Sequence, residues 1–365
     1  MTGDGRIEEV LSKPVKSVAE YIESIQKIIE ILDERNGQMT YVYRGETKYY
    51  ETHCQPNIFR DNYLENNPYF EKNLFDIMEA NDTTTGDTYL EKAIDAQHGG
   101  FPSRLLDVTY NCLVALYFSV TPYYRRAEDA ADTEDGKVYI FPIDKMYCPT
   151  SKNIQDAYDA IVNRAEAWML DSGICRRNHK LIDHITTNKR IISQQGAFIL
   201  FQGDTLTPIP PNRYWNLTVD RNKKKHIRED LKKLFGIHTG TIYPENENLV
   251  EEFVKKSNQA ETYPYSIVNE VRMALKGLDE VMDAQVRKLV ACRGAYEACM
   301  EIVEAAEQEI QDYRMDVEEI LEYADEKERQ EILRMYHKKL YHHIGEIRHY
   351  VNDRVEMSEH IFEIR

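Results

Sequence analysis

The chain has 365 residues, of which 42% are hydrophobic, so it can form one large domain or two ordinary ones with a substantial core. Its 63 acidic residues outnumber its 46 basic residues and give a formal net charge of −17, which argues against general binding to nucleic-acid phosphates. No stretch approaches the roughly 18 uninterrupted apolar residues of a membrane span, and the first residues lack a secretory pattern. We therefore expect a cytoplasmic protein with no membrane partner.

The six cysteines are spread along the chain without a Cys-x-x-Cys pair. Because most of them stand in segments with helix or strand patterns, we expect reduced thiols. A zinc site formed by Cys175, His179 and His184 is the alternative, but it needs a fourth ligand and a knuckle-like turn that the local sequence lacks. We therefore predict no metal site.

The first two thirds of the chain mix helix and strand patterns without a regular βαβ alternation. We expect a flexible lead over residues 1–14, then a helix that Ser17 and Glu20 cap and Gly37 ends. A strand over 40–43 leads into an Arg-Gly-Glu motif. Further helices are expected near 66–80, 87–97, 111–120, 152–171 and 223–234, and further strands at 137–141, 197–201 and 214–219. Residues 15–258 are thus predicted to form an α+β domain, a mixed sheet with flanking helices.

The composition changes after Pro264, because no proline occurs in the remaining residues. Apolar residues recur at alternating spacings of three and four along 299–320 and again along 333–355, which predicts two apolar seams on long helices. A break near 324–327 would fold these helices back on each other. We expect residues 265–365 to form an all-helical hairpin, similar to a coiled coil, that mediates self-association or docks a protein partner. Packing of both seams on the α+β domain is the alternative.

Polar residues suited to ligand binding flank several of the predicted elements. Arg44 ends a strand before a glycine, and a Gly-Gly-Phe-Pro loop lies between His98 and Arg104. Three cations and three neutral hydrogen-bonding residues would surround an anionic ligand, for which phosphate is the obvious candidate. The cations are Arg44, Arg104 and Arg190, and the neutral residues are Gln97, Gln194 and Gln195. We predict that Arg44, His98, Arg104, Asp107, Arg190 and Gln195 converge on one cleft.

Structural roles for the same residues stay open at this point. Arg104 with Asp107, and Arg44 with Glu46, have the composition of ion pairs that stabilise compact domains. His98 would in that case brace its loop.

The motif Tyr43-Arg-Gly-Glu46 resembles the opening of the FRG domain family, and the resemblance covers about residues 15–258. Its later parts are Pro56-Asn-Ile-Phe-Arg60, then Gln97-His98 with Pro102-Ser-Arg-Leu-Leu-Asp107, then Arg190 with Gln194-Gln-Gly-Ala-Phe198. Two positions depart from the family pattern. Gly99 replaces the usual aromatic residue and Val108 replaces the usual tryptophan.

The resemblance implies a bacterial or phage-related intracellular protein, such as an effector or toxin in anti-phage defence. Arg44 and the strand after Gln195 loosely resemble the layout of ADP-ribosyltransferases, but no glutamate precedes that strand. The catalytic carboxylate would then be Glu46 or Asp107. On this basis the catalytic residues are predicted to be Arg44, Glu46, His98 and Asp107, with NAD or another nucleotide as the cofactor. A non-catalytic nucleotide-sensing or protein-interaction module that assembles through its C-terminal helices is the alternative.

Overall fold

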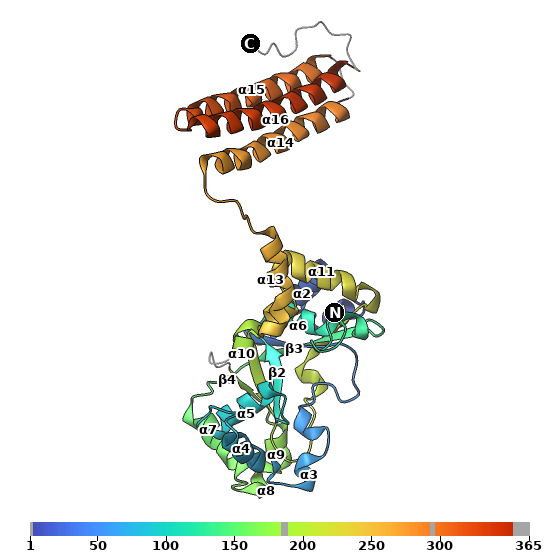
Figure 1. Cartoon of the computed structure of the whole chain (residues 1–365). Helices are drawn as coiled ribbons and strands as arrows, with labels where there is room; N and C mark the ends of the chain where they lie inside the picture. Colours follow the sequence, from blue (N-terminus) through green and yellow to red (C-terminus); the bar gives the residue numbers. More distant parts are fainter. Residues whose placement is uncertain (1–2, 184–188, 293–295, 353–365) are drawn as a thin grey trace. The chain divides into compact units, whose positions relative to one another are not determined.

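The computed structural model describes residues 3–183, 189–292 and 296–352. The chain divides into two compact units, Met1–Asn258 and Gln259–Arg365 (Figure 1). The first unit contains a mixed sheet with flanking helices and the second contains long helices, which confirms the predicted α+β class followed by a helical module. Among the helices that the structure describes, none has both the length and the apolar character needed to span a membrane.

The first unit is organised around a seven-stranded sheet with the order β4-β5-β6-β2-β1-β3-β7. Neighbouring strands are antiparallel except for β4 and β5. The strands are β1 (Thr40–Glu46), β2 (Leu105–Thr109), β3 (Gly136–Ile143), β4 (Met146–Tyr147), β5 (Lys180–Ile182), β6 (Gly196–Leu200) and β7 (Trp215–Val219). The segment around Asp107, for which we predicted no strand, is the central strand β2. Apart from Asp107, the residues of β2 are buried on both faces of the sheet, so the sequence lacks the alternation of apolar and polar residues that marks a half-exposed strand.

Local capping signals fix several helix ends. Ser17 accepts a hydrogen bond from the Glu20 amide at the start of α2, and Gly37 follows its last residue. The Asn111 side chain likewise accepts bonds from the first amides of α6. The helices of this unit are α1 (Gly3–Leu11), α2 (Val18–Asn36), α3 (Tyr63–Asn66), α4 (Phe70–Ala80), α5 (Tyr89–Gly99), α6 (Cys112–Val120), α7 (Lys152–Val162), α8 (Ala167–Leu170), α9 (Gly173–Arg177), α10 (Lys189–Gln194), α11 (Lys224–Phe235), α12 (Thr239–Ile242) and α13 (Asn246–Gln259).

The expected flexible lead is wrong for residues 3–11, which form α1. Ile7 is buried in the same hydrophobic cluster as the apolar face of α2, and Val15 forms a bridge with Val219 of β7. The polar composition of the segment conceals this packing, because a nine-residue helix is stabilised here by tertiary burial rather than by its own propensity.

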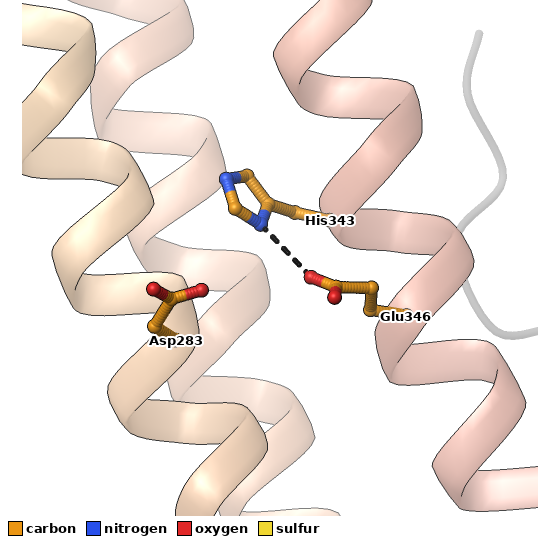
Figure 2. A group of neighbouring side chains, drawn as sticks. All are labelled: Asp283, His343 and Glu346. Atoms are coloured by element: carbon orange, nitrogen blue, oxygen red, sulfur yellow. Dashed lines mark ion pairs between the residues drawn. The ribbon is translucent and has the colours of Figure 1, made fainter.

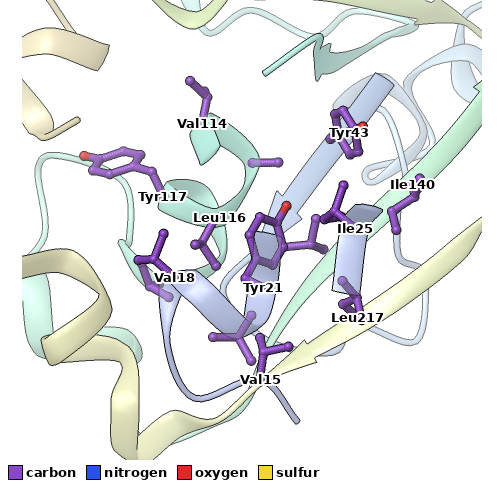
Figure 3. Packing of buried hydrophobic residues seen from close by; sticks show 14 of the residues in the cluster. Val15, Val18, Tyr21, Ile25, Tyr43, Val114, Leu116, Tyr117, Ile140 and Leu217 are labelled. Atoms are coloured by element: carbon purple, nitrogen blue, oxygen red, sulfur yellow. The ribbon is translucent and has the colours of Figure 1, made fainter. Parts of the chain in front are cut away.

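Helices cover one face of the sheet in two groups. In the first group α2, α6 and α11 pack over β1, β3 and β7, with Tyr21 and Leu116 at the centre (Figure 3). In the second group α4, α5, α7 and α10 pack over β2, β5 and β6 around Tyr158 and Phe198. The opposite face is covered by residues 54–64 and by side chains from 206–214. The boundary between the two helix groups therefore follows the junction of β1 and β2.

The junction of β1 and β2 is a short one. β1 registers with β3 from Thr40 to Glu46, whereas its pairing with β2 is registered at Tyr43 and Thr109. Beyond that pair the Arg44 side chain reaches β2, where its Nη1 donates to the Asp107 carbonyl at 2.8 Å. A side chain thus takes the place of a backbone ladder at this point of the sheet.

The second unit contains three helices, α14 (Ile267–Ala291), α15 (Tyr296–Leu321) and α16 (Glu326–Asn352), with the break between the last two where it was expected. Residues of both predicted seams are buried in one cluster with Val271, Leu275, Leu278 and Met282 of α14: Cys299, Ala306 and Val317 from the first, and Tyr336, Leu340, Ile347 and Val351 from the second. The hairpin prediction therefore lacked one helix, which packs against both others. Leu333, where we began the second seam, is not in this cluster, and its neighbour Ile332 is buried there instead. Val355, which we placed on the second seam, lies outside the described residues.

Candidate functional site

A cavity of about 260 Å³ lies at the junction of β1 and β2, between the two helix groups. Ordinary ligand pockets measure about 300–1,000 Å³, so this one has room for a ring and part of an attached group. Its lining residues come from both strands, from α5, α6 and α10, and from two later loops. They are Tyr43, Arg44, Gly45, Gln97, His98, Gly100, Asp107, Val108, Thr109, Phe118, Tyr123, Arg190, Gln194 and Tyr243.

Arg44 is a cavity residue whose guanidinium is already engaged by the protein. Its Nε donates to Glu46 Oε1 at 3.0 Å, in addition to the bond from Nη1 to the Asp107 carbonyl. Burial opposes the charged form, but the surrounding acidic groups, of which Glu46 contributes most, together raise the pKa of Arg44 above its ordinary value. Arg44 therefore has the structural ion pair that we considered as an alternative, and it also lines the cavity.

Gln97, His98 and Asp107 form a polar wall of the cavity. The Gln97 amide nitrogen donates to Asp107 Oδ2 at 2.5 Å, which leaves Gln97 Oε1 as the outward acceptor. This oxygen and His98 Nε2 are buried and have no hydrogen-bond partner among the described residues. Burial also lowers the pKa of His98 below its usual value, so its imidazole is neutral at pH 7. Two buried polar atoms on a cavity wall are points at which a ligand would complete the hydrogen bonding.

Arg190 and its aromatic neighbours form the adjoining part of the wall. Its Nη1 donates to the His98 carbonyl at 3.1 Å, and its Nη2 lies 2.9 Å from Glu245 Oε1. The guanidinium carbon stands 4.8 Å from the Tyr243 ring centre and 5.7 Å from that of Tyr124, which are cation–π distances. Gln194 joins α10 to α12 beside this wall, because its side chain donates to the Ile242 carbonyl at 3.2 Å.

Arg104, which we predicted to bind the ligand, lies elsewhere in the core. Its Nε is 2.7 Å from Glu71 Oε2, and its Nη1 donates to the carbonyls of Phe201 and Gly203. The Glu71 carboxylate also accepts a bond from Tyr158 at 2.6 Å. The two ionic side chains are only 2% and 3% exposed. Arg104 is thus a structural residue, and its ion-pair partner is Glu71 rather than the expected Asp107.

Two further predicted site residues do not line the cavity. Glu46 is buried on the far side of Arg44, where Oε1 also accepts the Cys54 amide, so it is not positioned to touch a ligand. Gln195 has a left-handed φ of 46° at the turn between α10 and β6. Its carbonyl accepts the Tyr110 amide, so it serves the backbone at that turn. The predicted cleft therefore brings together Arg44, His98, Asp107 and Arg190, without Arg104 and Gln195.

The sequence interpretation missed the aromatic part of the cavity. Tyr43, Phe118, Tyr123 and Tyr243 line it, although only the first stands in the motif with which the site was predicted. The Arg-Gly pair at the end of β1 was the available signal for the rest. A Cβ on Gly45 would lie 1.9 Å from the Ala115 carbonyl oxygen, so glycine is what allows α6 and its Phe118 to lie directly on the strand.

The two departures from the family pattern have different settings. Val108 follows Asp107 on β2, so the two side chains point to opposite faces of the sheet. The Val108 side chain packs in the hydrophobic cluster on the face away from Asp107. A Cβ on Gly99 would lie 2.8 Å from the Phe101 ring, so a larger residue there requires that ring to move. Neither position supplies an aromatic ring to the cavity.

The alternative zinc ligands are only partly within the described residues. His179 Nε2 lies 2.9 Å from the Thr207 carbonyl oxygen, and its ring packs against Phe201. Cys175 is in α9, whereas His184 lies outside the described residues.

Comparison with known proteins gives one match. The model of the FRG domain matches residues 39–128, a segment that contains β1, β2, α5, α6 and with them Arg44, His98 and Asp107. Arg190, Gln194 and Tyr243 lie beyond the matched segment, although they line the same cavity. No curated protein and no solved structure matches the chain. The chain therefore contains an FRG domain, and the matched segment supplies Arg44, His98 and Asp107 to the cavity.

Proposed function

We propose that the first unit binds a nucleotide-like small molecule in the cavity between β1 and β2. The observation that carries this proposal is the pair of buried polar atoms, Gln97 Oε1 and His98 Nε2, on the wall of a cavity that also has aromatic residues. A nucleobase or a nicotinamide ring offers the matching combination of a flat apolar face and hydrogen-bonding edge groups.

The anionic part of such a ligand would lie toward Arg190. Among the groups that this guanidinium contacts, the His98 carbonyl is fixed in the backbone, whereas the Glu245 carboxylate is 40% exposed. A phosphate can replace an exposed carboxylate on the same guanidinium nitrogen at little cost in free energy. The carboxylate is planar and the phosphate tetrahedral, but both are oxyanions that accept charge-assisted hydrogen bonds. Arg44 would act differently, since its guanidinium is held by Glu46 and the Asp107 carbonyl.

Chemistry similar to that of ADP-ribosyltransferases would depend on Asp107. Asp107 is the one carboxylate among the described lining residues, and Gln97 orients it. In this proposal the nicotinamide–ribose bond of NAD breaks, nicotinamide leaves with the bonding electrons, and Asp107 stabilises the oxocarbenium charge on the sugar until an acceptor attacks. The neutral imidazole of His98 would accept the proton of that acceptor.

The binding proposal is tested by calorimetry of the full chain with NAD, ADP-ribose, ATP and nicotinamide. At least one of these ligands should bind. Arg190→Ala should weaken the binding of a phosphate-containing ligand by about tenfold or more, and it should weaken the binding of nicotinamide less. Arg221→Ala is the matched control, because Arg221 forms an exposed pair with Asp135 far from the cavity lining. Equal binding by both variants would refute the assignment of Arg190.

The catalytic proposal has its own readout, the release of nicotinamide from NAD measured by chromatography. Asp107→Asn keeps the shape and the contact with Gln97, so it should abolish release while ligand binding persists. Binding of a nucleotide without any turnover by the parent chain would instead favour the non-catalytic sensor.

The biological setting that we propose is anti-phage defence or toxicity in a bacterial or phage-related context, on the resemblance to FRG proteins. Self-association or partner docking through residues 265–365 also stays a prediction. Expression of the parent chain and of Asp107→Asn in bacteria challenged with phage tests the setting. Protection or growth arrest by the parent and none by the variant is the expected result.

A further inference from the structure

The second unit contains a buried histidine whose two ring nitrogens have different environments. His343 of α16 is 3% exposed at its side chain, and its Nε2 lies 2.9 Å from Asp279 Oδ1 of α14. Asp279 also forms an ion pair with Lys339. Because an ionised carboxylate can only accept, this bond places a proton on Nε2. The remaining nitrogen, Nδ1, then presents its lone pair unless the ring is doubly protonated.

Nδ1 of His343 faces a second group that can only accept. Glu346 Oε2, one turn along the same helix, lies 3.5 Å from it (Figure 2). Both atoms are buried, and neither has a hydrogen-bond partner within the part of the chain that the structure describes. Two lone pairs that face each other in a buried place repel, so a positive centre is needed between or beside them.

Asp283 of α14 completes this group from the neighbouring helix (Figure 2). One ligand atom from each of Asp283, His343 and Glu346 lies within 4.8 Å of the other two. Two ligands on a tetrahedral zinc ion are roughly 3.4 Å apart, so the distance of 3.5 Å between His343 and Glu346 fits without movement. Asp283 is exposed, and a rotation of its side chain brings its carboxylate to the same centre.

We propose that Asp283, His343 and Glu346 bind a divalent transition-metal ion of the zinc type and thereby join α14 to α16. An imidazole ligand favours such an ion over magnesium or calcium, which prefer oxygen ligands. Asp279 has the role of the carboxylate that orients a metal-binding histidine, because it holds the ring nitrogen that does not face the metal. The rival explanation is a doubly protonated His343 held between Asp279 and Glu346, with Asp283, Lys339 and His342 as the other charged groups around it.

The test uses the full chain, cleared of metal by a chelator and titrated with Co²⁺ and Zn²⁺. Co²⁺ reports its ligands by absorption, and a site of nitrogen and oxygen ligands lacks the intense near-ultraviolet band of thiolate binding, which separates it from the six cysteines. We expect one such site per chain. Asp283→Asn and Glu346→Gln should each weaken it by about tenfold or more, and Asp279→Asn by about tenfold.

The matched control is His342→Gln, one residue away on the same helix. The His342 ring is exposed, and its Nε2 lies 3.7 Å from Glu346 Oε2. His342 and Glu346 are therefore the surface pair that could bind an added metal ion without a designed site. This variant should bind Co²⁺ as the parent does. A loss as large as that of Glu346→Gln would assign the ion to the surface pair and overturn the proposal. Asp283→Asn changes an exposed side chain, so unchanged binding by this folded variant, or no binding by the parent, would favour the doubly protonated histidine.

Discussion

Arg104 and Arg190 have different environments in the first unit, although the sequence led us to predict the same ligand-binding role for both. Arg104 has its charge matched by Glu71 and its other donors by backbone carbonyls, all in the core. Arg190 lies at the wall of a cavity with aromatic neighbours, and its contacts include a backbone carbonyl and a half-exposed carboxylate. Arg44 is intermediate, since it lines the same cavity but is held by Glu46. In our proposal, the burial of the partners separates the structural role of Arg104 from the ligand-binding role of Arg190.

The largest effect is expected for Arg104. Arg104→Met should lower the free energy of unfolding by about 3–5 kcal/mol, because it leaves the Glu71 carboxylate buried without its cation. Chemical denaturation measures this loss. The double variant Arg104→Met with Glu71→Leu should recover a large part of it. A loss below about 1 kcal/mol for the single variant would mean that Arg104 is as replaceable as a surface residue.

Arg44 should give an intermediate effect on stability. Arg44→Ala removes the bonds to Glu46 and to the Asp107 carbonyl, and it leaves a 7% exposed carboxylate without its cation, so we expect a loss of about 2–3 kcal/mol. Glu46→Gln is the companion variant, since it removes the charge but keeps an acceptor for the Cys54 amide. Thermal unfolding of both variants is the measurement. If Arg44→Ala melted like the parent, the two strands would not depend on this side chain.

Arg190 should affect stability least of the three arginines and ligand binding most. Arg190→Ala loses a bond to a carbonyl and a pair with an exposed carboxylate, for which about 1 kcal/mol is expected. The same denaturation measurements as for Arg104 give this value. A loss as large as that of Arg104→Met would place Arg190 in the structural class and remove the contrast.

The smallest effect concerns pH and His98. Burial lowers the pKa of His98 in the folded chain below its unfolded value near 6.5, so its neutral form stabilises the fold above that pH. This stabilisation is lost as the pH falls through the pKa of His98 in the folded chain, because His98 binds a proton more readily in the unfolded chain. Denaturation at pH 7 and pH 5 should show a smaller acid loss for His98→Gln than for the parent. An equal loss in both would exclude His98 as its source.

The elements that the sequence predicted well are those with local signals. The caps of α2 and α6 and the break before α16 depend on residues within a few positions of one another, such as Ser17, Asn111 and Gly37. β2 and α1 could not be predicted in this way. β2 is buried on both faces by partners distant in the sequence, and α1 is stabilised by the burial of Ile7.

The candidate site was predictable only in part, for the same reason. Arg44, His98, Asp107 and Arg190 do line one cavity, but the partner of Arg104 is Glu71, which lies on α4 and in none of the motifs used. In the second unit, likewise, α14 had no assigned place beside the two seams. Leu340 of α16 is buried in the core that α14 completes, so a charged residue at this position would destabilise the helical unit.

The close contact of α6 with the sheet has a consequence for how the cavity can adapt to different molecules. A Cβ on Gly136 of β3 would lie 2.3 Å from the Ser119 carbonyl oxygen, and a Cβ on Gly45 of β1 would likewise clash with the Ala115 carbonyl oxygen. At these glycines the two strands therefore contact the backbone of α6 directly, with no side chain between them. A helix seated in this way cannot slide or rotate without a clash, and the wall that carries Phe118 is therefore rigid. Tyr123 and Tyr243 lie after helix ends, so selectivity among ligands of different size would be set by these loops.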